Sequence, residues 1–451
     1  MEYQQQVIKN RFNLMSEYID EKDLSLLEPV VKCIPTLTQF ELSFYPYSRI
    51  GKKGVQKISE ALSISQNLSQ FKLYLNRLRV GNEAIEILSQ GISNCLNLQF
   101  FVLNLSENRM NSLSFQKLSE NLAKCQQLMA IDLDVSQNYI VNDECCQKAL
   151  QTIFTNIPNL KLFSINFNQN ELGTNNKAAN LFIYMHRSSK LEYLCLNLDQ
   201  TNISEEEVFQ IGYSIQELKT LKDIQLSLNG NEQLEKSLIQ VAEGINSCYN
   251  LNRLGLNLGE IQACTKVIKK LYEGVSSQEQ LKSLQIQLLS VACYDQNQTV
   301  VFFISKILLR CQNLTQLFLS LIWIKILDED MYLLGQSLIQ CKQIQKLQIN
   351  LGNQFTTHSG MIALFQAIAK CQTISQLVLS VGLNQVFVFE ELSKAVINLQ
   401  NLISLKLYSS CITFSSCLDF SQKIRTCQKL VKIVIWLQQI NNLLKLKFFC
   451  C

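Results

Sequence analysis

Residues Leu191–Leu198 read LEYLCLNL, with leucine at the first, fourth, sixth and eighth positions. The same pattern returns at Leu68–Leu75, Leu251–Leu258 and Ile344–Leu351, with Ile and Phe replacing Leu at some positions. Its copies begin at residues 37, 68, 98, 128, 160, 191, 221, 251, 281, 314, 344, 374, 402 and 430. A motif that recurs at so narrow a spacing indicates a repeat protein whose core runs from one copy into the next.

Each repeat changes its hydrophobic period along its length. The first part alternates apolar and polar residues, which predicts a strand. A short polar turn follows, with Asn108, Asn138 and Asn170 each lying ten residues after the start of its repeat. The remainder has apolar residues at helical spacing, as in Ala84–Ile92. Each repeat is therefore expected to form a strand, a turn, a helix and a return turn.

Composition excludes several classes of protein. Of 451 residues, 47% are hydrophobic and 17% charged, which argues against wholesale disorder. Lys and Arg number 41 against 37 Asp and Glu, a near-balance from which we expect no nucleic-acid partner. With two His residues and no nucleotide-binding, kinase or metalloprotease motif, we predict no catalytic, cofactor-binding or metal-binding residues and no small-molecule substrate. The chain is expected not to be an enzyme.

The sequence also indicates a cellular compartment. The first residues lack a basic segment followed by an apolar one, so we expect no signal peptide. Apolar runs such as Val300–Ile304 are much shorter than the roughly 20 residues of a membrane helix, so no membrane association is predicted. The 17 Cys are an odd number without compact pairing, which favours reduced thiols and a cytoplasmic location.

Seven cysteines share one place in the repeat, three residues before the next repeat begins. In other repeats this place holds Ile157, Leu218 or Leu399. Cysteine that alternates with Ile and Leu behaves as a small buried hydrophobic residue, so we interpret the thiols as core packing. These cysteines are Cys95, Cys125, Cys248, Cys311, Cys341, Cys371 and Cys427.

The repeat resembles the leucine-rich repeat family, and its length of 28–33 residues resembles the ribonuclease-inhibitor-like subclass. The resemblance covers residues 37 to 437 and implies an α/β solenoid, or horseshoe, of about 14 repeats. It implies a parallel β-sheet on the concave face and helices on the convex face. We expect an N-terminal helical cap over 1–36 and one solenoid domain over 37–451, with the last repeat and tail from 430. The composition, rich in Gln and Asn, resembles that of ciliate proteins.

The strand pattern also predicts which side chains face away from the core. Residues at offsets three, five and seven from a repeat start should point inward, so those at offsets two, four and six should point outward. The polar residues at offset six fit either a ladder of hydrogen bonds between strands or a recognition strip. Outward apolar, aromatic and acidic residues gather in the second to sixth repeats, and we predict that they bind a partner. They are Tyr74, Phe100, Val102, Asp132, Asp134, Leu162 and Tyr193.

Three functions fit the sequence. The first is a non-enzymatic scaffold that binds a protein partner through the concave face, as the family resemblance implies. The second is activation of a Ran-type GTPase, which some members of the subclass perform with residues in strand-to-helix loops. Arg49, Arg77, Arg79 and Arg109 occupy such loops, but the acidic tail of those activators is missing. The third is a structural part of a ciliary or cytoskeletal assembly.

Overall fold

The computed structural model describes residues 9–14, 21–173, 180–232, 234–261, 265–289, 299–352, 358–381, 386–409, 420, 422–424, 427, 429–439 and 442–449. The chain divides into two compact units, Met1–Asn231 and Glu232–Cys451. Each unit has the leucine-rich repeat fold. Among the described residues, the fourteen expected strands are present as β2–β15, and each begins two residues after its predicted repeat start.

The first unit alternates strands and helices. Its strands are β1 (Lys9–Leu14), β2 (Gln39–Phe44), β3 (Gln70–Tyr74), β4 (Phe100–Asn104), β5 (Ala130–Asp134), β6 (Leu162–Asn166), β7 (Tyr193–Asn197) and β8 (Asp223–Ser227). Its α-helices are α1 (Glu28–Cys33), α2 (Gly51–Ser63), α3 (Gly81–Ile92), α4 (Ser112–Leu122), α5 (Glu144–Asn156) and α6 (Glu205–Glu217). Its 3-10 helices are η1 (Glu21–Leu27), η2 (Ile34–Thr36) and η3 (Met185–Arg187). The strands pair in parallel, each with the next along the chain.

The second unit continues the alternation. Its strands are β9 (Arg253–Gly259), β10 (Ser283–Leu289), β11 (Gln316–Ile322), β12 (Lys346–Gly352), β13 (Gln376–Val381), β14 (Ser404–Ser409), β15 (Lys432–Gln439) and β16 (Asn442–Phe449). Its helices are α7 (Glu235–Asn246), α8 (Thr265–Ser276), α9 (Val300–Arg310), α10 (Asp328–Gln340), α11 (His358–Ile368) and α12 (Val386–Asn398). The strands β9–β15 are parallel, and β16 pairs antiparallel with β15.

Two local elements differ from the sequence expectation. Part of the expected helical cap over 1–36 is a strand, because Lys9–Leu14 adds to the sheet edge as β1, in parallel with β2. Among the described residues of this segment, helical turns are present from Glu21 onward. Between β6 and β7 the described residues contain only the three-residue helix η3, whereas the repeat pattern predicts a longer helix.

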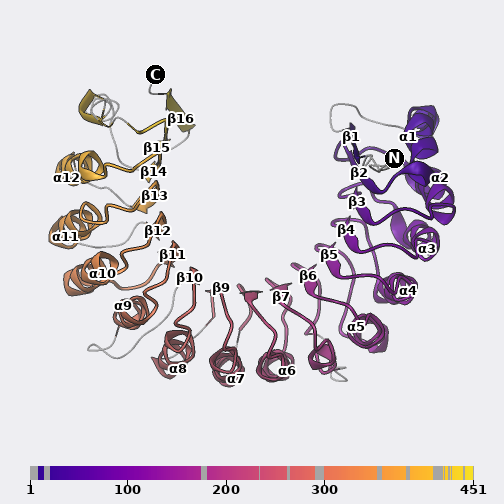
Figure 1. Cartoon of the computed structure of the whole chain (residues 1–451), viewed down its shortest axis with the longest axis horizontal. Coiled ribbons are helices and arrows are strands. Elements are labelled where there is room, and N and C mark those ends of the chain that lie inside the picture. Colours follow the sequence, from indigo (N-terminus) through magenta and orange to yellow (C-terminus); the bar gives the residue numbers. More distant parts are fainter. Residues whose placement is uncertain are drawn as a thin grey trace, which may run out of the picture. The chain divides into compact units, whose positions relative to one another are not determined.

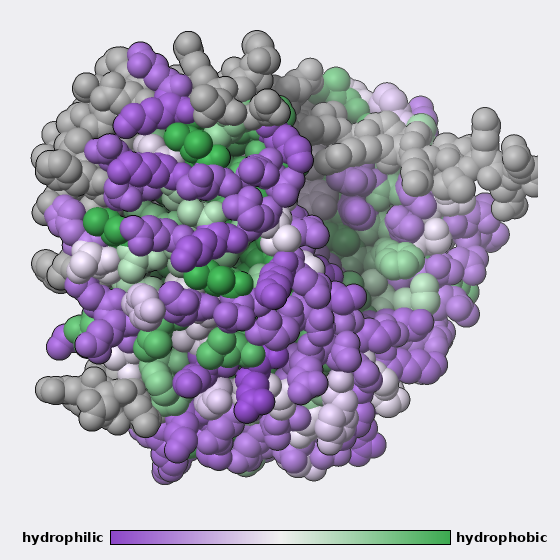
Figure 2. All heavy atoms as spheres, turned by 60° about the vertical axis from the view of Figure 1, so that its left-hand side comes forward, coloured by the Kyte–Doolittle hydropathy of each residue, from purple (hydrophilic) through white to green (hydrophobic). Residues whose placement is uncertain are grey.

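The core lies between the sheet and the helices. Within each unit the strands lie on the inner side and the helices on the outer side (Figure 1). Side chains at offsets three, five and seven are buried, as in the ring stack of Phe40, Phe71 and Phe101 across β2–β4, with 5.9 Å between successive centroids. Figure 2 shows a face on which hydrophilic side chains prevail and hydrophobic ones form small separate areas.

The difference in width between strands and helices explains why each unit bends. Neighbouring strands lie about 4.8 Å apart, whereas packed helices are separated by about 8–10 Å. A stack of repeats must therefore curve with its sheet on the inside. The curvature places the outward side chains of the strands on a concave surface. The strand-to-helix loops lie along one rim of that surface.

Buried asparagines hold successive turns together. The Asn138 Oδ1 atom accepts the backbone N–H groups of Asn108 (3.0 Å) and Met110 (2.8 Å), and its Nδ2 donates to the carbonyls of Leu105 and Val135 at 2.9 Å. Asn108, Asn170 and Asn231 make corresponding bonds between other repeats. The asparagine ten residues into a repeat therefore pairs backbone groups that the turn leaves without strand partners.

We expect Asn138→Ala to lower the free energy of unfolding by about 2–4 kcal/mol, since it leaves several buried backbone groups without partners. Asn138 is only 6% exposed. The measurement is urea unfolding followed by circular dichroism. Asn97→Ala is the control, because Asn97 is exposed and donates a single hydrogen bond, to the Gln66 carbonyl. Equal stability losses in the two variants would show that the asparagine ladder does not hold the turns.

Candidate functional site

The parallel register places the seven predicted contact residues in three adjacent rows on the concave surface of the first unit. In the first row Phe100, Ala130, Leu162 and Tyr193 follow one another across β4–β7. In the second row Val102 pairs with Asp132. In the third row Tyr74, Asn104 and Asp134 are successive partners. Directly paired side chains on one sheet face lie about 5 Å apart, so these residues form one continuous patch.

The members of this patch differ in how far they reach solvent. Phe100 is 38% exposed and Asp132 is also exposed. Tyr74, Val102, Leu162 and Tyr193 are half-buried. Burial raises the pKa of the Tyr193 hydroxyl, and the neighbouring Cys195 and Asp223 act in the same direction. The hydroxyl therefore stays protonated at neutral pH and hydrogen-bonds the neighbouring Cys195.

Asp134 has a structural role besides its place in the patch. Its Oδ1 accepts the backbone N–H of Ser136 at 3.1 Å, and its Oδ2 accepts Asn104 Nδ2 at 3.1 Å. Asn166 and Asn197 accept the N–H two residues ahead in the same way. The sequence allowed the offset-six residues to act either between strands or on a ligand. In the structure these residues chiefly close the turn at the end of their own strand.

A second group of outward residues lies at the end of the second unit. The rings of Tyr408 and Trp436, on β14 and β15, are parallel within 7° with centroids 6.0 Å apart. Lys406 and Lys432 lie on the same strands at offset positions that also face outward, and pair with Val434 and Ser404 in the register. The aromatic rings are thus already stacked on each other, and the sequence pattern carried no signal for this pair beyond their shared offset.

The loop arginines lie along the rim that follows β2, β3 and β4. All four arginines are exposed. Arg77 Nε forms an ion pair with Glu107 at 2.5 Å, and its guanidinium lies 6.0 Å from the ring centre of Tyr47. Arg77 is thereby fixed by its neighbours. Arg49, Arg79 and Arg109 have no ion pair or side-chain hydrogen bond within the described part of the chain.

Glu207 is a buried carboxylate that the sequence pattern did not distinguish from Glu205 and Glu206. Three acidic residues after a serine are typical of the start of a helix, and α6 does begin there, with Ser204 accepting the Glu207 N–H. However, the Glu207 side chain is fully buried and accepts the Leu181 N–H at 2.9 Å and Asn142 Nδ2 at 3.1 Å. It therefore fixes the segment before η3 to α6. Burial raises its pKa to about 7, although the hydrogen-bond donors oppose the shift.

We predict that Glu207 makes stability depend on pH. Its pKa is raised from the usual 4.5 to about 7 on folding, so its stabilising contribution is complete below pH 4.5 and is lost as pH rises through 7. The total change is on the order of 3 kcal/mol. The free energy of unfolding of the wild type relative to Glu207→Gln should fall over this range. Glu206→Gln, at an exposed position on the same helix, is the control and should show no such slope. A flat difference for Glu207→Gln would contradict the assignment.

The cysteines of the return turn pack as expected from the sequence. Cys95, Cys125 and Cys341 are buried, and their thiols donate to the carbonyls of Leu62, Ile92 and Leu308 at 3.3–3.4 Å. Burial raises the pKa of each of these three thiols to about 12, so they are protonated and unreactive at neutral pH. Each acceptor carbonyl belongs to the helix of the preceding repeat, which explains why a weak donor can stand where Ile or Leu stands elsewhere.

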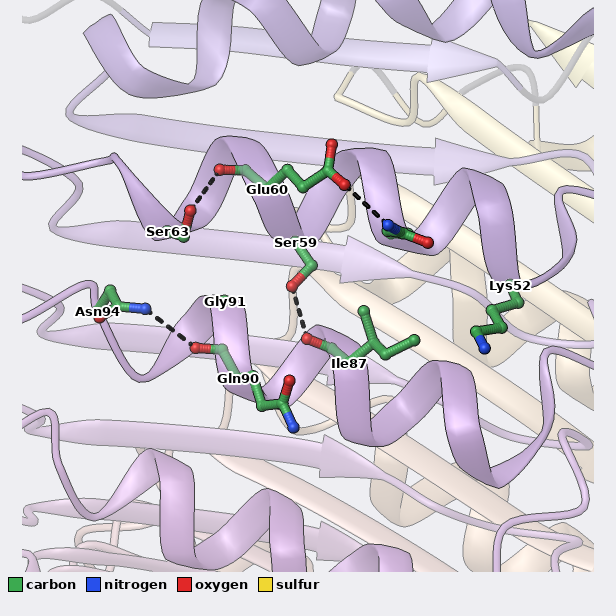
Figure 3. Close-up of a pocket in the computed structure, with 9 residues that line it drawn as sticks. Lys52, Ser59, Glu60, Ser63, Ile87, Gln90, Gly91 and Asn94 are labelled. Atoms are coloured by element: carbon green, nitrogen blue, oxygen red, sulfur yellow. Dashed lines mark hydrogen bonds between the residues drawn. The ribbon is translucent and has the colours of Figure 1, made fainter.

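A pocket of about 410 Å³ lies between α2 and α3, on the opposite side of the repeat from the patch. Figure 3 shows that its polar groups mostly bind one another: Ser59 Oγ donates to the Ile87 carbonyl at 2.5 Å, and Asn94 Nδ2 donates to the Gln90 carbonyl at 3.2 Å. A Cβ atom at Gly91 would lie 2.4 Å from the Ser59 carbonyl oxygen, so glycine allows the two helices to approach closely. The pocket lies where these two helices pack against each other.

Two other kinds of site are absent from the described residues. Within them no group of three or more His, Cys, Asp or Glu side chains is placed to hold a metal ion. In that same part of the chain, no helix has both the length and the apolar character needed to cross a membrane.

The chain was compared with family models, curated proteins and solved structures. No protein-family model matches the chain, and no curated protein matches it. Among solved structures, the chain is similar to "Crystal structure of TLR13-ssRNA13 complex", with 13% identity and a TM-score of 0.44. The match covers 91% of this chain and 59% of the other, so this chain spans about three-fifths of that chain's length.

One expectation from the sequence is corrected by this comparison. The near-balanced net charge led us to exclude a nucleic-acid partner. The similar solved structure is of a complex with single-stranded RNA, so we withdraw the expectation that this chain has no nucleic-acid partner. Net charge averages over the whole surface, whereas binding depends on the charge of one region.

Proposed function

We propose that this protein is a non-enzymatic scaffold that binds a protein partner through the concave surface of its first unit. The observation that carries the proposal is the continuous patch formed by Phe100, Leu162 and Tyr193 with Asp132 beside them. Exposed aromatic residues next to a charged side chain are the composition of binding hot spots. A preformed sheet also holds its side chains in place, which lowers the entropic cost of association.

The repeat length and strand-helix alternation support placing the chain in the ribonuclease-inhibitor-like subclass. A cytoplasmic location is supported by the seven return-turn cysteines, which are free of disulfides where described. We include the subclass and the cytoplasmic location in the proposal. Activation of a Ran-type GTPase stays the alternative. Of the loop arginines, Arg77 is engaged by Glu107. The other three make no ion pair within the described residues.

The test is affinity purification with mass spectrometry from the native cell, with the wild type beside a variant carrying Tyr74, Phe100, Asp132 and Tyr193→Ala. Asp134 is left intact because its loss would disturb the turn after β5. We expect at least one partner to be lost from the variant, since the substitutions remove the aromatic anchors and the exposed carboxylate.

The matched control replaces exposed residues on the outer helices, Gln90 and Lys117→Ala, and should retain every partner. Circular dichroism of both variants confirms folding. Partners retained by the concave variant and lost by the helix variant would contradict the proposal and place binding on the outer face. Recovery of a small GTPase as the lost partner would favour the GTPase-activator function. Recovery of cytoskeletal proteins would favour a structural role.

A further inference from the structure

The loops after β2–β5 present two rows of side chains at a constant interval. Arg49, Arg79, Arg109 and Tyr139 are each thirty residues apart. A second row runs beside them, formed by Tyr47, Arg77, Glu107 and Gln137, again thirty residues apart. All four members of the second row have positive φ, between 54° and 69°, as do Arg79 and Arg109. The second row thus has the same backbone conformation in four successive loops, and in the first row Arg79 and Arg109 share it.

Hydrogen bonds fix this register. The Arg77 N–H donates to the Ser106 carbonyl at 2.9 Å, and the Tyr139 N–H donates to the Met110 carbonyl at 2.8 Å. The residues flanking Arg109 are both hydrogen-bonded to Asn138 of the next repeat. These bonds join the loop after β3 to the loop after β4, and the loop after β4 to the loop after β5.

The first row carries charge without a partner. Arg49, Arg79 and Arg109 are exposed and make no ion pair or side-chain hydrogen bond with the described residues. Like charges on successive loops repel one another. This repulsion lowers stability while the three side chains add no polar contact among the described residues, which is typical of positions kept for binding. Two exposed tyrosines accompany the arginines. Tyr139, 64% accessible, is the last residue of the first row, and Tyr47, 57% accessible, is the first residue of the second row.

We propose that this arginine ridge, formed by Arg49, Arg79 and Arg109 with Tyr47 and Tyr139, binds an acidic segment of a protein partner in extended conformation. The inference rests on the proposed function and adds the chemistry of the partner. The ridge adjoins the patch, because Tyr74 and Arg79 belong to the same repeat and are separated by one turn. A partner seated on the concave surface can therefore lay its acidic segment along the rim.

The dimensions fit an extended segment. Neighbouring strands lie about 4.8 Å apart, so successive arginines at the rim are separated by at least this distance and somewhat more as the loops diverge toward the helices. In an extended chain, alternate side chains lie on one face about 6.6–6.8 Å apart. Three carboxylates at alternate positions thus match three arginines, and each guanidinium can donate two parallel hydrogen bonds to its carboxylate.

The composition of the ridge favours a protein over a nucleic acid. Arg and Tyr are enriched in protein interfaces, whereas Lys is depleted, and the ridge contains no lysine. The row of arginines spans three repeats, and the equivalent positions of the next two repeats hold Tyr139 and Glu171. A single nucleic-acid strand usually requires a basic groove that continues over many nucleotides.

The experiment measures fluorescence anisotropy of a labelled twelve-residue peptide of alternating Glu and Ser, with the full-length protein at 50 and 150 mM NaCl. We expect saturable binding that weakens with salt. R49A/R79A/R109A should weaken it at least tenfold. The matched control, K266A/K269A/K270A, removes three lysines from α8 of the other unit and should stay within twofold of wild type. A Gln-Ser peptide should not bind.

Three outcomes would overturn the inference. One is equal binding by the arginine variant and the lysine control. Another is tighter binding of a twelve-nucleotide oligo(dT), lost in the arginine variant, which would make the ridge a phosphate site. The third is absence of peptide binding to wild type. A Phe100/Tyr193→Ala variant separates the two proposals, because it should bind the peptide normally even where it loses the partner on the concave patch.

Discussion

The structure depends on one constraint: a single repeat cannot bury its own apolar residues. A strand and a helix of about thirty residues leave one apolar face and two edges of unpaired backbone, and only the next repeat can cover them. The stack of Phe40, Phe71 and Phe101 and the bonds that Asn138 makes to the neighbouring turn are direct results of this requirement. Stability is therefore shared along each unit.

The same constraint separates the residues that must be kept from those that can vary. Offsets three, five, seven and ten are fixed by the core and the asparagine ladder, as is the return-turn position where Cys, Ile and Leu alternate. Offsets two and four, and the loop positions at the rim, contribute little to stacking. Chemistry that differs between repeats is thus confined to the concave surface and its rim. This explains why the patch and the arginine ridge lie next to each other.

The sequence alone was enough to predict the structural features that recur in every repeat. The period located every strand from β2 to β15, the inward offsets located the core, and the buried cysteines were identified by their exchange with Ile157 and Leu218. The sequence was not enough to predict features that occur in one repeat only. Nothing in the pattern showed that Lys9–Leu14 would add as an edge strand, or that the chain before η3 would be fixed by Glu207. Burial of Glu207 arises because a neighbouring segment lies over it, and local sequence does not contain that information.

The candidate site was only partly predictable for a related reason. The alternation of apolar and polar residues predicted which side chains point outward. Whether these side chains form one continuous patch depends on Ala130, a small residue between Phe100 and Leu162 in the register. The arginines were visible in the sequence as loop residues. The positive φ of Arg77, Arg79 and Arg109 and the ion pair of Arg77 with Glu107 required the structure.

Hydrogen–deuterium exchange of the full-length protein, alone and with a recovered partner, tests the central claim most directly. If the concave surface and its rim bind the partner, protection should increase in β3–β7 and in the loops that follow β2–β5, while α2–α6 remain unchanged. Protection confined to the outer helices, with these strands and loops unchanged, would contradict the account.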